Sequence, residues 1–178
     1  LNQIISANLE VIYKDFMTVD VKDYLPKNYK NLYIIANIPY YITTPIIEKI
    51  INSNLSEKAC VLMVQKEVAD RFSASCGSRD YGSISVFLDY YYKVDKLFAV
   101  PRKAFYPIPN VDSAVIKLTR KNRDVSLDEE KFFKFVKSAF QFKRKNLRNN
   151  LINYDLEKIN SVLINYNHSL QNRAEEIS

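Results

Sequence analysis

The tetrapeptide Asn37-Ile38-Pro39-Tyr40 is the segment of this chain best suited to bind a flat ring that carries an amino group. It follows a short apolar run, residues 32–36, and open α/β sheets bind ligands where their strands end. Proline restricts the backbone, so the Asn37 side-chain oxygen and the Ile38 carbonyl can converge as two acceptors for one exocyclic amino group. Tyr40 offers a ring face for stacking. A turn whose aromatic side chain packs into the core would leave the same pattern.

A second candidate segment, residues 105–113, precedes a predicted strand and contains an aromatic side chain close to two prolines. Pro107 and Pro109 would hold Phe105 in one orientation at little entropic cost, as a stacking platform for an extruded base requires. Two prolines in a loop before a strand are also common without any function.

Basic side chains are concentrated in the C-terminal part of the chain. The formal net charge is +6, the first hundred residues are balanced, and the whole surplus therefore lies in residues 101–178. The excess is strongest between Arg102 and Arg148. Such clustering is typical of a polyanion-binding surface, although a solvated basic face has the same composition.

Several classes of site are excluded by composition. Two glycines are too few for a phosphate-cradling or dinucleotide loop. Cys60 and Cys76 form no disulfide or zinc pattern and are expected to be reduced, and the single His168 has no ligand partners nearby, so we expect no metal site. No apolar run is long enough to span a membrane and the first residues lack a signal-peptide pattern, so we expect a soluble intracellular protein.

Apolar runs and helical-length segments alternate in the first two thirds of the chain, which predicts an α/β fold. The predicted strands are residues 9–13, 32–36, 59–64, 93–100 and 113–120, the last two paired with each other. The predicted helices are residues 44–51, 66–72 and a segment that begins at Ser83.

The pattern changes after Lys121. A polar linker, residues 121–125, leads to a capping-box spacing that starts at Ser126, and helical periodicity then predicts three or four short helices up to Ser178. We therefore expect two domains, the α/β part in residues 1–122 and a small all-α domain in residues 123–178.

The order of these motifs resembles the small-subunit ribosomal RNA adenine N6,N6-dimethyltransferases, the KsgA/RsmA family. Besides the two segments above, the resemblance is carried by residues 65–71, 81–86, 144–151 and 173–178, so it runs almost from end to end. The resemblance implies the C-terminal part of a Rossmann-like methyltransferase sheet followed by a small helical domain. It also implies dimethylation of adenine N6 in small-subunit (16S) ribosomal RNA, dependent on S-adenosylmethionine, in support of ribosome biogenesis.

Site residues follow from the resemblance position by position. Asn37, Ile38, Pro39 and Tyr40 match the catalytic loop, and Phe105 matches the aromatic residue that packs against the target base. Asp15 and Phe16 match the residues that bind the adenine of the cofactor, together with Asn37, although a bare Asp at a strand end is also a common turn former. The residues expected to contact RNA phosphates are Arg102, Lys103, Lys143, Arg144, Lys145 and Arg148.

The family's glycine-rich cofactor loop and its ribose-binding acidic residue have no counterpart in this chain. We therefore expect these 178 residues alone to be inactive in methyl transfer. Two alternatives stay open, a non-catalytic RNA-binding factor of ribosome assembly and a related large-subunit ribosomal RNA adenine methyltransferase. The expected partner is the small ribosomal subunit, bound by a monomer in the cytoplasm, or in an organelle if a transit peptide precedes the chain.

Overall fold

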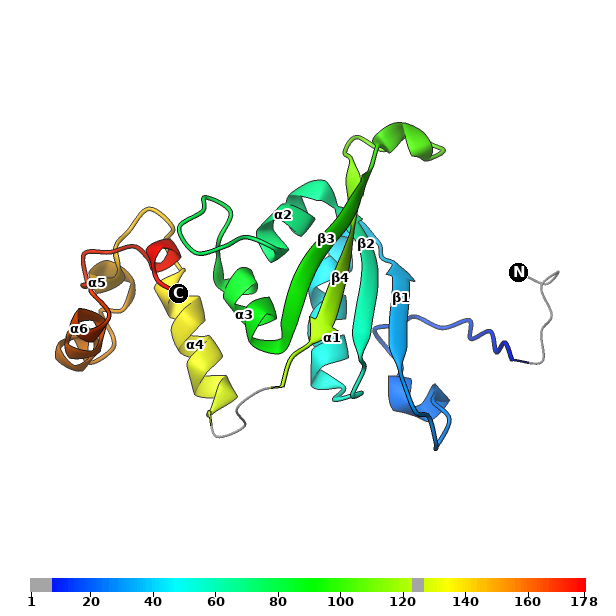
Figure 1. The fold of residues 1–178 in the computed structure, drawn as a ribbon, viewed down its shortest axis with the longest axis horizontal. Coiled ribbons are helices and arrows are strands. Elements are labelled where there is room, and N and C mark those ends of the chain that lie inside the picture. The colour runs from blue at the N-terminus through cyan, green and yellow to red at the C-terminus, as the bar shows by residue number, and fades with distance from the viewer. Residues whose placement is uncertain (1–7, 123–126) are drawn as a thin grey trace.

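A computed structural model of the chain describes residues 8–122 and 127–178 (Figure 1). Its centre is one mixed sheet of four strands in the order β1-β2-β4-β3. The strands are β1 (Tyr33–Asn37), β2 (Ala59–Gln65), β3 (Tyr92–Val100) and β4 (Ser113–Arg120). β1 and β2 are parallel, whereas β4 is antiparallel to both of its neighbours. The predicted pairing of β3 with β4 is confirmed.

The register of the strands brings two loops to one edge of the sheet. Asn37, the last residue of β1, pairs with Met63 near the end of β2. Ser113, the first residue of β4, pairs with Gln65 at the end of β2 and with Val100 at the end of β3. The loop that follows β1 and the loop between β3 and β4 therefore both leave the sheet at the edge where β1 and β2 end.

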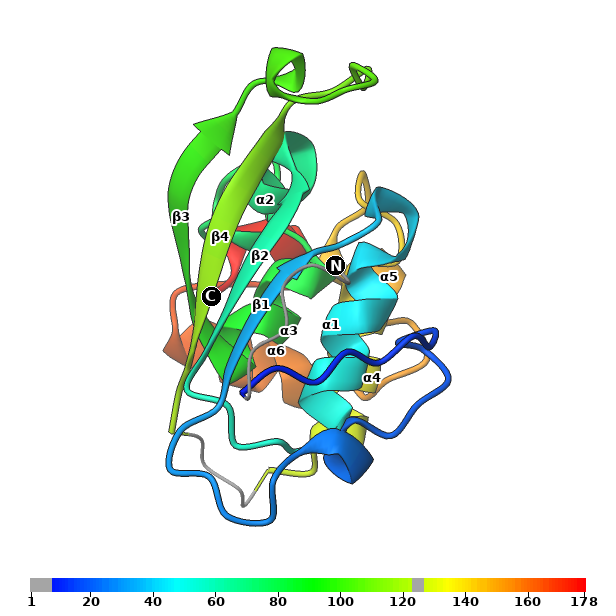
Figure 2. The same ribbon diagram turned by 90° about the vertical axis from the view of Figure 1, so that its right-hand side faces the viewer.

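One face of the sheet carries the main core. Alternate residues of β2 and β4, such as Leu62 and Ile116, are completely buried because successive side chains of a strand point to opposite faces. The helices α1 (Thr43–Asn52), α2 (Lys66–Phe72) and α3 (Ser83–Tyr91) cover this face (Figure 2). On the opposite face, Ile35 of β1 is 82% exposed.

The helices of the α/β part begin and end close to where the sequence predicts. α1 turns four isoleucines toward the sheet, and Ile47 and Ile51 are almost completely buried. Their spacing places them on one helical face, which explains why local periodicity was sufficient to predict this helix. α3 runs directly into β3, also as predicted.

A buried ion pair lies at the end of the sheet away from the β3–β4 loop. The Glu57 carboxylate is completely buried and accepts hydrogen bonds from Arg120 Nη1, at 2.7 Å, and from the Tyr92 phenol. Desolvation, followed by the bond to Glu57, raises the pKa of Tyr92 far above its ordinary value. Burial likewise raises the pKa of the neighbouring Cys60 thiol to about 12.

The C-terminal region is helical and packs around a second, smaller core. Its helices are α4 (Glu129–Ala139), α5 (Leu147–Asn150) and α6 (Leu156–Asn165), followed by a 3-10 turn at Ala174–Glu176. The Phe133 ring of α4 lies 4.9 Å from the Phe87 ring and 5.7 Å from the Tyr91 ring, centroid to centroid, so α4 also packs on α3. Within the described ranges, no helix is long and apolar enough to cross a membrane.

Two local predictions are wrong. Residues 9–13 form no strand: they are exposed, and in the part of the chain that the structure describes they pair with no strand. A strand needs a neighbour to accept and donate its backbone hydrogen bonds, which an apolar run alone does not provide. The predicted capping box does not start α4, because its N-cap is Asp128, whose side chain accepts a hydrogen bond from the Lys131 N–H. Ser126 and the expected domain boundary at residue 123 lie outside the described residues.

Candidate functional site

The two segments singled out in the sequence meet at one cavity. The cavity has a volume of about 350 Å³ and opens at the edge of the sheet where β1 ends. Its lining consists of Asn37, Ile38, Pro39, Tyr40, Phe105, Tyr106, Pro107 and Pro109. The structure thus brings together all five residues expected to be catalytic.

The loop after β1 is anchored through its second residue. Ile38 is buried in the main core, 5% exposed, whereas Asn37 and Pro39 on either side of it are exposed. A 3-10 turn, Tyr40–Ile42, follows at once and is closed by the Ile42 N–H bonding to the Pro39 carbonyl at 3.2 Å. An apolar anchor between two exposed residues keeps the backbone rigid and leaves the Asn37 side chain free at the cavity.

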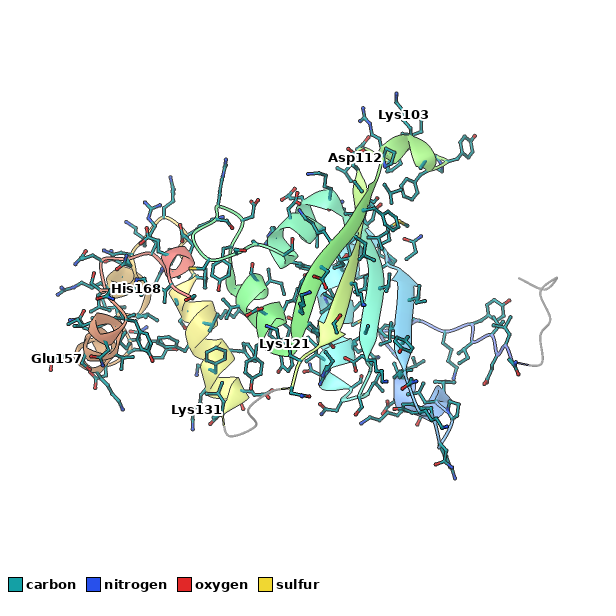
Figure 3. All side chains as sticks on the ribbon, in the orientation of Figure 1. Lys103, Asp112, Lys121, Lys131, Glu157 and His168 are labelled. Carbon is teal, nitrogen blue, oxygen red and sulfur yellow. The ribbon has the colours of Figure 1, made fainter. Side chains whose placement is uncertain are left out.

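The loop before β4 is held at both ends. The Arg102 N–H donates to Asp112 Oδ1 at 2.8 Å, and the Phe105 N–H donates to the Arg102 carbonyl at 3.2 Å. The Lys66 N–H donates to the Asp112 carbonyl at 2.9 Å, which ties the base of the loop to the start of α2. Figure 3 shows Asp112 at the base of this loop and Lys103 at its tip.

Sequence reasoning gave no role to Ser113. Its hydroxyl is completely buried and is hydrogen-bonded to the Tyr40 phenol, so it connects the two loops of the cavity. The only signal in the sequence is that Ser113 ends the second motif. A contact between segments so far apart along the chain has no local pattern from which it could be recognised.

Asp15 and Phe16 do not line this cavity. Asp15 Oδ1 accepts the Met17 N–H at 2.8 Å and its carbonyl accepts the Thr18 N–H at 3.0 Å, so Asp15 forms a turn. The Lys49 ammonium lies 5.4 Å from the centre of the Phe16 ring. A carboxylate suits an adenine amino group, but the cavity that contains Asn37 does not contain Asp15. The cofactor role of Asp15 and Phe16 therefore stays a prediction.

Five of the six basic residues expected to contact RNA lie in two loops, and the sixth, Arg148, is exposed on α5. Arg102 and Lys103 are exposed on the β3–β4 loop, and Arg144 and Lys145 are exposed on the loop between α4 and α5. Both loops lie in the upper half of the views in Figures 1 and 2, but in Figure 1 they are well separated along the long axis of the molecule, with α2 and α3 between them.

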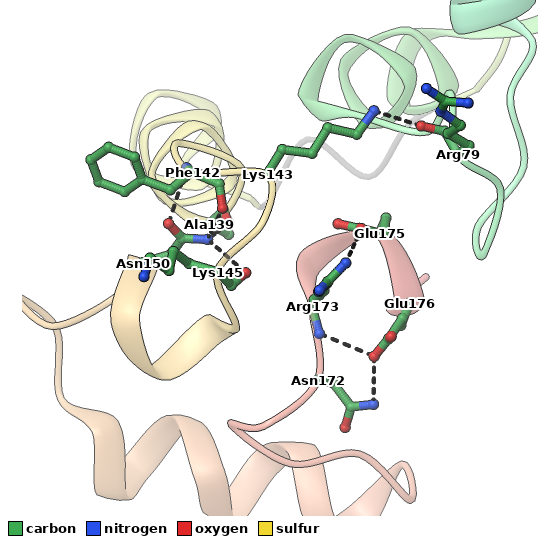
Figure 4. Close-up of polar contacts among 10 residues, drawn as sticks. All are labelled: Arg79, Ala139, Phe142, Lys143, Lys145, Asn150, Asn172, Arg173, Glu175 and Glu176. Atoms are coloured by element: carbon green, nitrogen blue, oxygen red, sulfur yellow. Dashed lines mark hydrogen bonds and ion pairs between the residues drawn. The ribbon is translucent and has the colours of Figure 1, made fainter.

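The loop between α4 and α5 is shaped by one buried amide (Figure 4). Asn150, 8% exposed, accepts the Phe142 N–H at 3.1 Å and donates to the Ala139 carbonyl at 2.7 Å. The Lys143 ammonium donates a hydrogen bond to the Arg79 carbonyl oxygen, with 2.6 Å between Nζ and O, and so connects this loop to the loop before α3. Of the expected RNA contacts, Lys143 is thus already engaged within the protein.

No metal site is found in the described part of the chain, where no cluster of three His, Cys, Asp or Glu residues could hold an ion. Cys60 is buried and Cys76 is exposed, and both are free thiols.

The sheet order, the helices on the sheet and a cavity at the edge where β1 and β2 end are those of a Rossmann-like methyltransferase fold. Within that class, the chain belongs to the ribosomal RNA adenine dimethylase family, whose model matches residues 2–176. The family and the fold class expected from the sequence are both confirmed.

Relatives of known name agree with this assignment. The ribosomal RNA small subunit methyltransferase A of Bacillus pumilus (strain SAFR-032) is 44% identical over 82% of this chain and 52% of its own length. The corresponding protein of Bacillus mycoides (strain KBAB4) is 38% identical over 97% of this chain and 63% of its own length. The chain thus spans between about half and two thirds of the length of these relatives.

Two solved structures are similar to this one. A dimethyladenosine transferase from Plasmodium falciparum superposes with a TM-score of 0.78 and 26% identity, covering 97% of this chain and 69% of that chain. The 23S rRNA methyltransferase ErmE superposes with a TM-score of 0.68 and 19% identity, covering 95% of this chain and 69% of its own, and shares the fold.

Proposed function

We propose that the full-length protein transfers methyl groups from S-adenosylmethionine to N6 of adenine in small-subunit ribosomal RNA. The observation that carries the proposal is the meeting of the Asn37–Tyr40 loop and Phe105 at one cavity. A surface that only binds RNA needs no pair of acceptors beside two aromatic rings. The names of the relatives support the small ribosomal subunit as the substrate.

The cavity residues would bind one base that has left its stack. Flipping a base out of a stack costs a few kcal/mol, and the cost is smaller in a loop. The rings of Tyr40 and Phe105 repay part of this cost by stacking on the extruded adenine. Pro107 and Pro109, in the loop that carries Phe105, limit the entropy that is lost when the base is bound.

Asn37 and Ile38 would then orient the reacting nitrogen. The N6 lone pair of adenine is normally delocalised into the ring. Hydrogen bonds from the amino group to Asn37 Oδ1 and to the Ile38 carbonyl favour a pyramidal nitrogen whose lone pair points out of the ring plane. S-adenosylmethionine supplies an electrophilic methyl group on a sulfonium. The contribution of this chain is thus orientation and electrostatics, and the electron-rich ring faces stabilise the positive charge in the site.

The exposed cations of the two basic loops would bind the RNA backbone. Arg102 and Lys103 beside the cavity and Arg144, Lys145 and Arg148 in the helical region contact phosphates, which position the RNA without reading its sequence.

The test is methyl transfer by the full-length protein to undermethylated small ribosomal subunits, followed by nucleoside analysis of the RNA by mass spectrometry. We expect N6-methylated adenines in the small-subunit RNA only. RNA binding without any methylated adenine would overturn the proposal in favour of an assembly factor. Methylation of large-subunit RNA instead would overturn the assigned substrate.

A further inference from the structure

Tyr106 is a completely exposed aromatic residue at the rim of the cavity. Its side chain is 100% exposed, whereas its neighbour Phe105 is half-buried. Phe105 has an extended backbone, with φ −114° and ψ 150°, and in extended chain successive side chains point in opposite directions. Both residues line the cavity, but Phe105 is half-buried in its wall whereas Tyr106 is fully exposed to solvent at its rim.

The backbone that carries Tyr106 is held in place although its ring is free. Pro107 follows it directly, and the bonds of the Arg102 N–H to Asp112 and of the Phe105 N–H to the Arg102 carbonyl close the loop on its other side. A ring on a preorganised loop loses little conformational freedom when it binds a partner. A tyrosine offers a large flat surface with only two side-chain torsions to fix.

The charge around Tyr106 favours a nucleic acid as that partner. Arg102 and Lys103 are exposed on the same short loop, and within the described ranges no ion pair involves either of them. Lys103 projects from the tip of the loop, away from the sheet (Figure 3). An exposed aromatic ring beside unpaired cations is the combination that binds single-stranded RNA, because the cations hold the phosphates while the ring stacks on a base.

We propose that Tyr106 stacks on a base that flanks the target adenine in the RNA strand and thereby holds the strand in register with the cavity. This proposal rests on the proposed function, since it takes the cavity as the site of the target base. With Phe105 in the wall of the cavity and Tyr106 exposed at its rim, two successive bases of the strand would contact adjacent residues of one loop. Tyr106 is then an RNA-binding residue that does not touch the reacting atoms.

The test compares three variants of the full-length protein with the unchanged protein. Tyr106→Ala removes the ring and Tyr106→Phe keeps it, whereas Tyr166→Ala removes another exposed tyrosine, 72% exposed, at the end of α6. The substrate is a small-subunit RNA fragment in which 2-aminopurine replaces the base next to the methylated adenine, on either side in turn. Methyl transfer and 2-aminopurine fluorescence are measured on the same samples.

We expect Tyr106→Ala to raise KM for the RNA at least about fivefold with little change in kcat, since stacking of one base on an aromatic ring is typically worth that factor or more. Binding should quench 2-aminopurine on one side of the target in the unchanged protein, in Tyr106→Phe and in Tyr166→Ala, and this quenching should be lost in Tyr106→Ala. An unchanged KM and unchanged quenching in Tyr106→Ala would overturn the inference alone. Absence of methyl transfer by the unchanged protein would instead overturn the proposed function, and with it this inference.

Discussion

The Tyr40 phenol and the Ser113 hydroxyl are hydrogen-bonded to each other although 73 residues separate them along the chain. Ser113 is the first residue of β4, and its backbone is paired with Gln65 on one side and with Val100 on the other. The sheet therefore determines where the Ser113 hydroxyl lies, and the hydroxyl in turn orients the Tyr40 ring. The contact joins the two loops that form the cavity.

Removal of the Ser113 hydroxyl should slow methyl transfer without weakening RNA binding. In Ser113→Ala the Tyr40 ring keeps its stacking surface but loses the bond that orients it. Because such a bond is worth about 1 kcal/mol, kcat should fall roughly fivefold while Kd for the RNA stays the same. Tyr40→Phe should have the same effect, and the double variant should be no slower than either single variant. Additive losses in the double variant would show that the two groups act independently.

Hydrophobic periodicity predicted the helices and strands correctly where an element packs against one that is nearby in the chain. The helix at Thr43–Asn52 was predicted from its isoleucine spacing. The two motifs meet because β1 is parallel to β2 and β4 is antiparallel to it, so the end of β1 and the start of β4 lie at the same end of the sheet. The run at residues 9–13 has the composition of a strand, but a strand also needs a partner, and composition does not contain that information.

The partners of individual side chains could not be predicted from the sequence. The charge pattern correctly marks residues 143–145 as basic, but it cannot tell that Lys143 donates to the Arg79 carbonyl while Arg144 stays exposed. Glu57 and Arg120 are 63 residues apart and become partners only because β2 and β4 are neighbours. Both cases depend on tertiary structure rather than on local pattern.

The ion pair between Glu57 and Arg120 should be important for stability. Glu57→Gln removes the charge that compensates Arg120 in a buried place, and breaking a buried pair in this way typically costs about 3 kcal/mol of unfolding free energy. The matched control is Asp89→Asn, because Asp89 pairs with Lys121 in solvent with its side chain 77% exposed. The control should lose less than about 1 kcal/mol. Chemical denaturation of both variants measures the difference, and equal losses would contradict a special role of the buried pair.

Asn150 should control RNA binding through the loop between α4 and α5. Asn150→Ala removes the bonds to Phe142 and Ala139, so the loop loses its fixed shape and its cations no longer face the RNA together. We expect weaker RNA binding and a shallower dependence of log Kd on log salt, since fewer phosphates are contacted. Asn149→Ala is the control, because Asn149 is exposed and its side chain bonds only to the nearby Asn146. An unchanged salt dependence in Asn150→Ala would contradict the assigned role of the loop.

The two cysteines should differ sharply in reactivity. Burial raises the pKa of Cys60 to about 12, so at pH 8 almost no reactive thiolate is present there, whereas Cys76 is exposed. Alkylation of the native protein followed by peptide mass spectrometry should find Cys76 modified and Cys60 unmodified. Both should react after denaturation. Rapid labelling of Cys60 in the native protein would show that the sheet opens at its buried face.

The most direct test of the account is the Asn37→Ala variant of the full-length protein. We expect methyl transfer to small-subunit RNA to be lost, because one of the two acceptors that orient N6 is gone. Kd for the RNA and the unfolding free energy should stay close to those of the unchanged protein. Asn37 is exposed at the cavity, so its truncation leaves the core intact. Methyl transfer by Asn37→Ala at the rate of the unchanged protein would contradict the central claim that this cavity orients the adenine amino group.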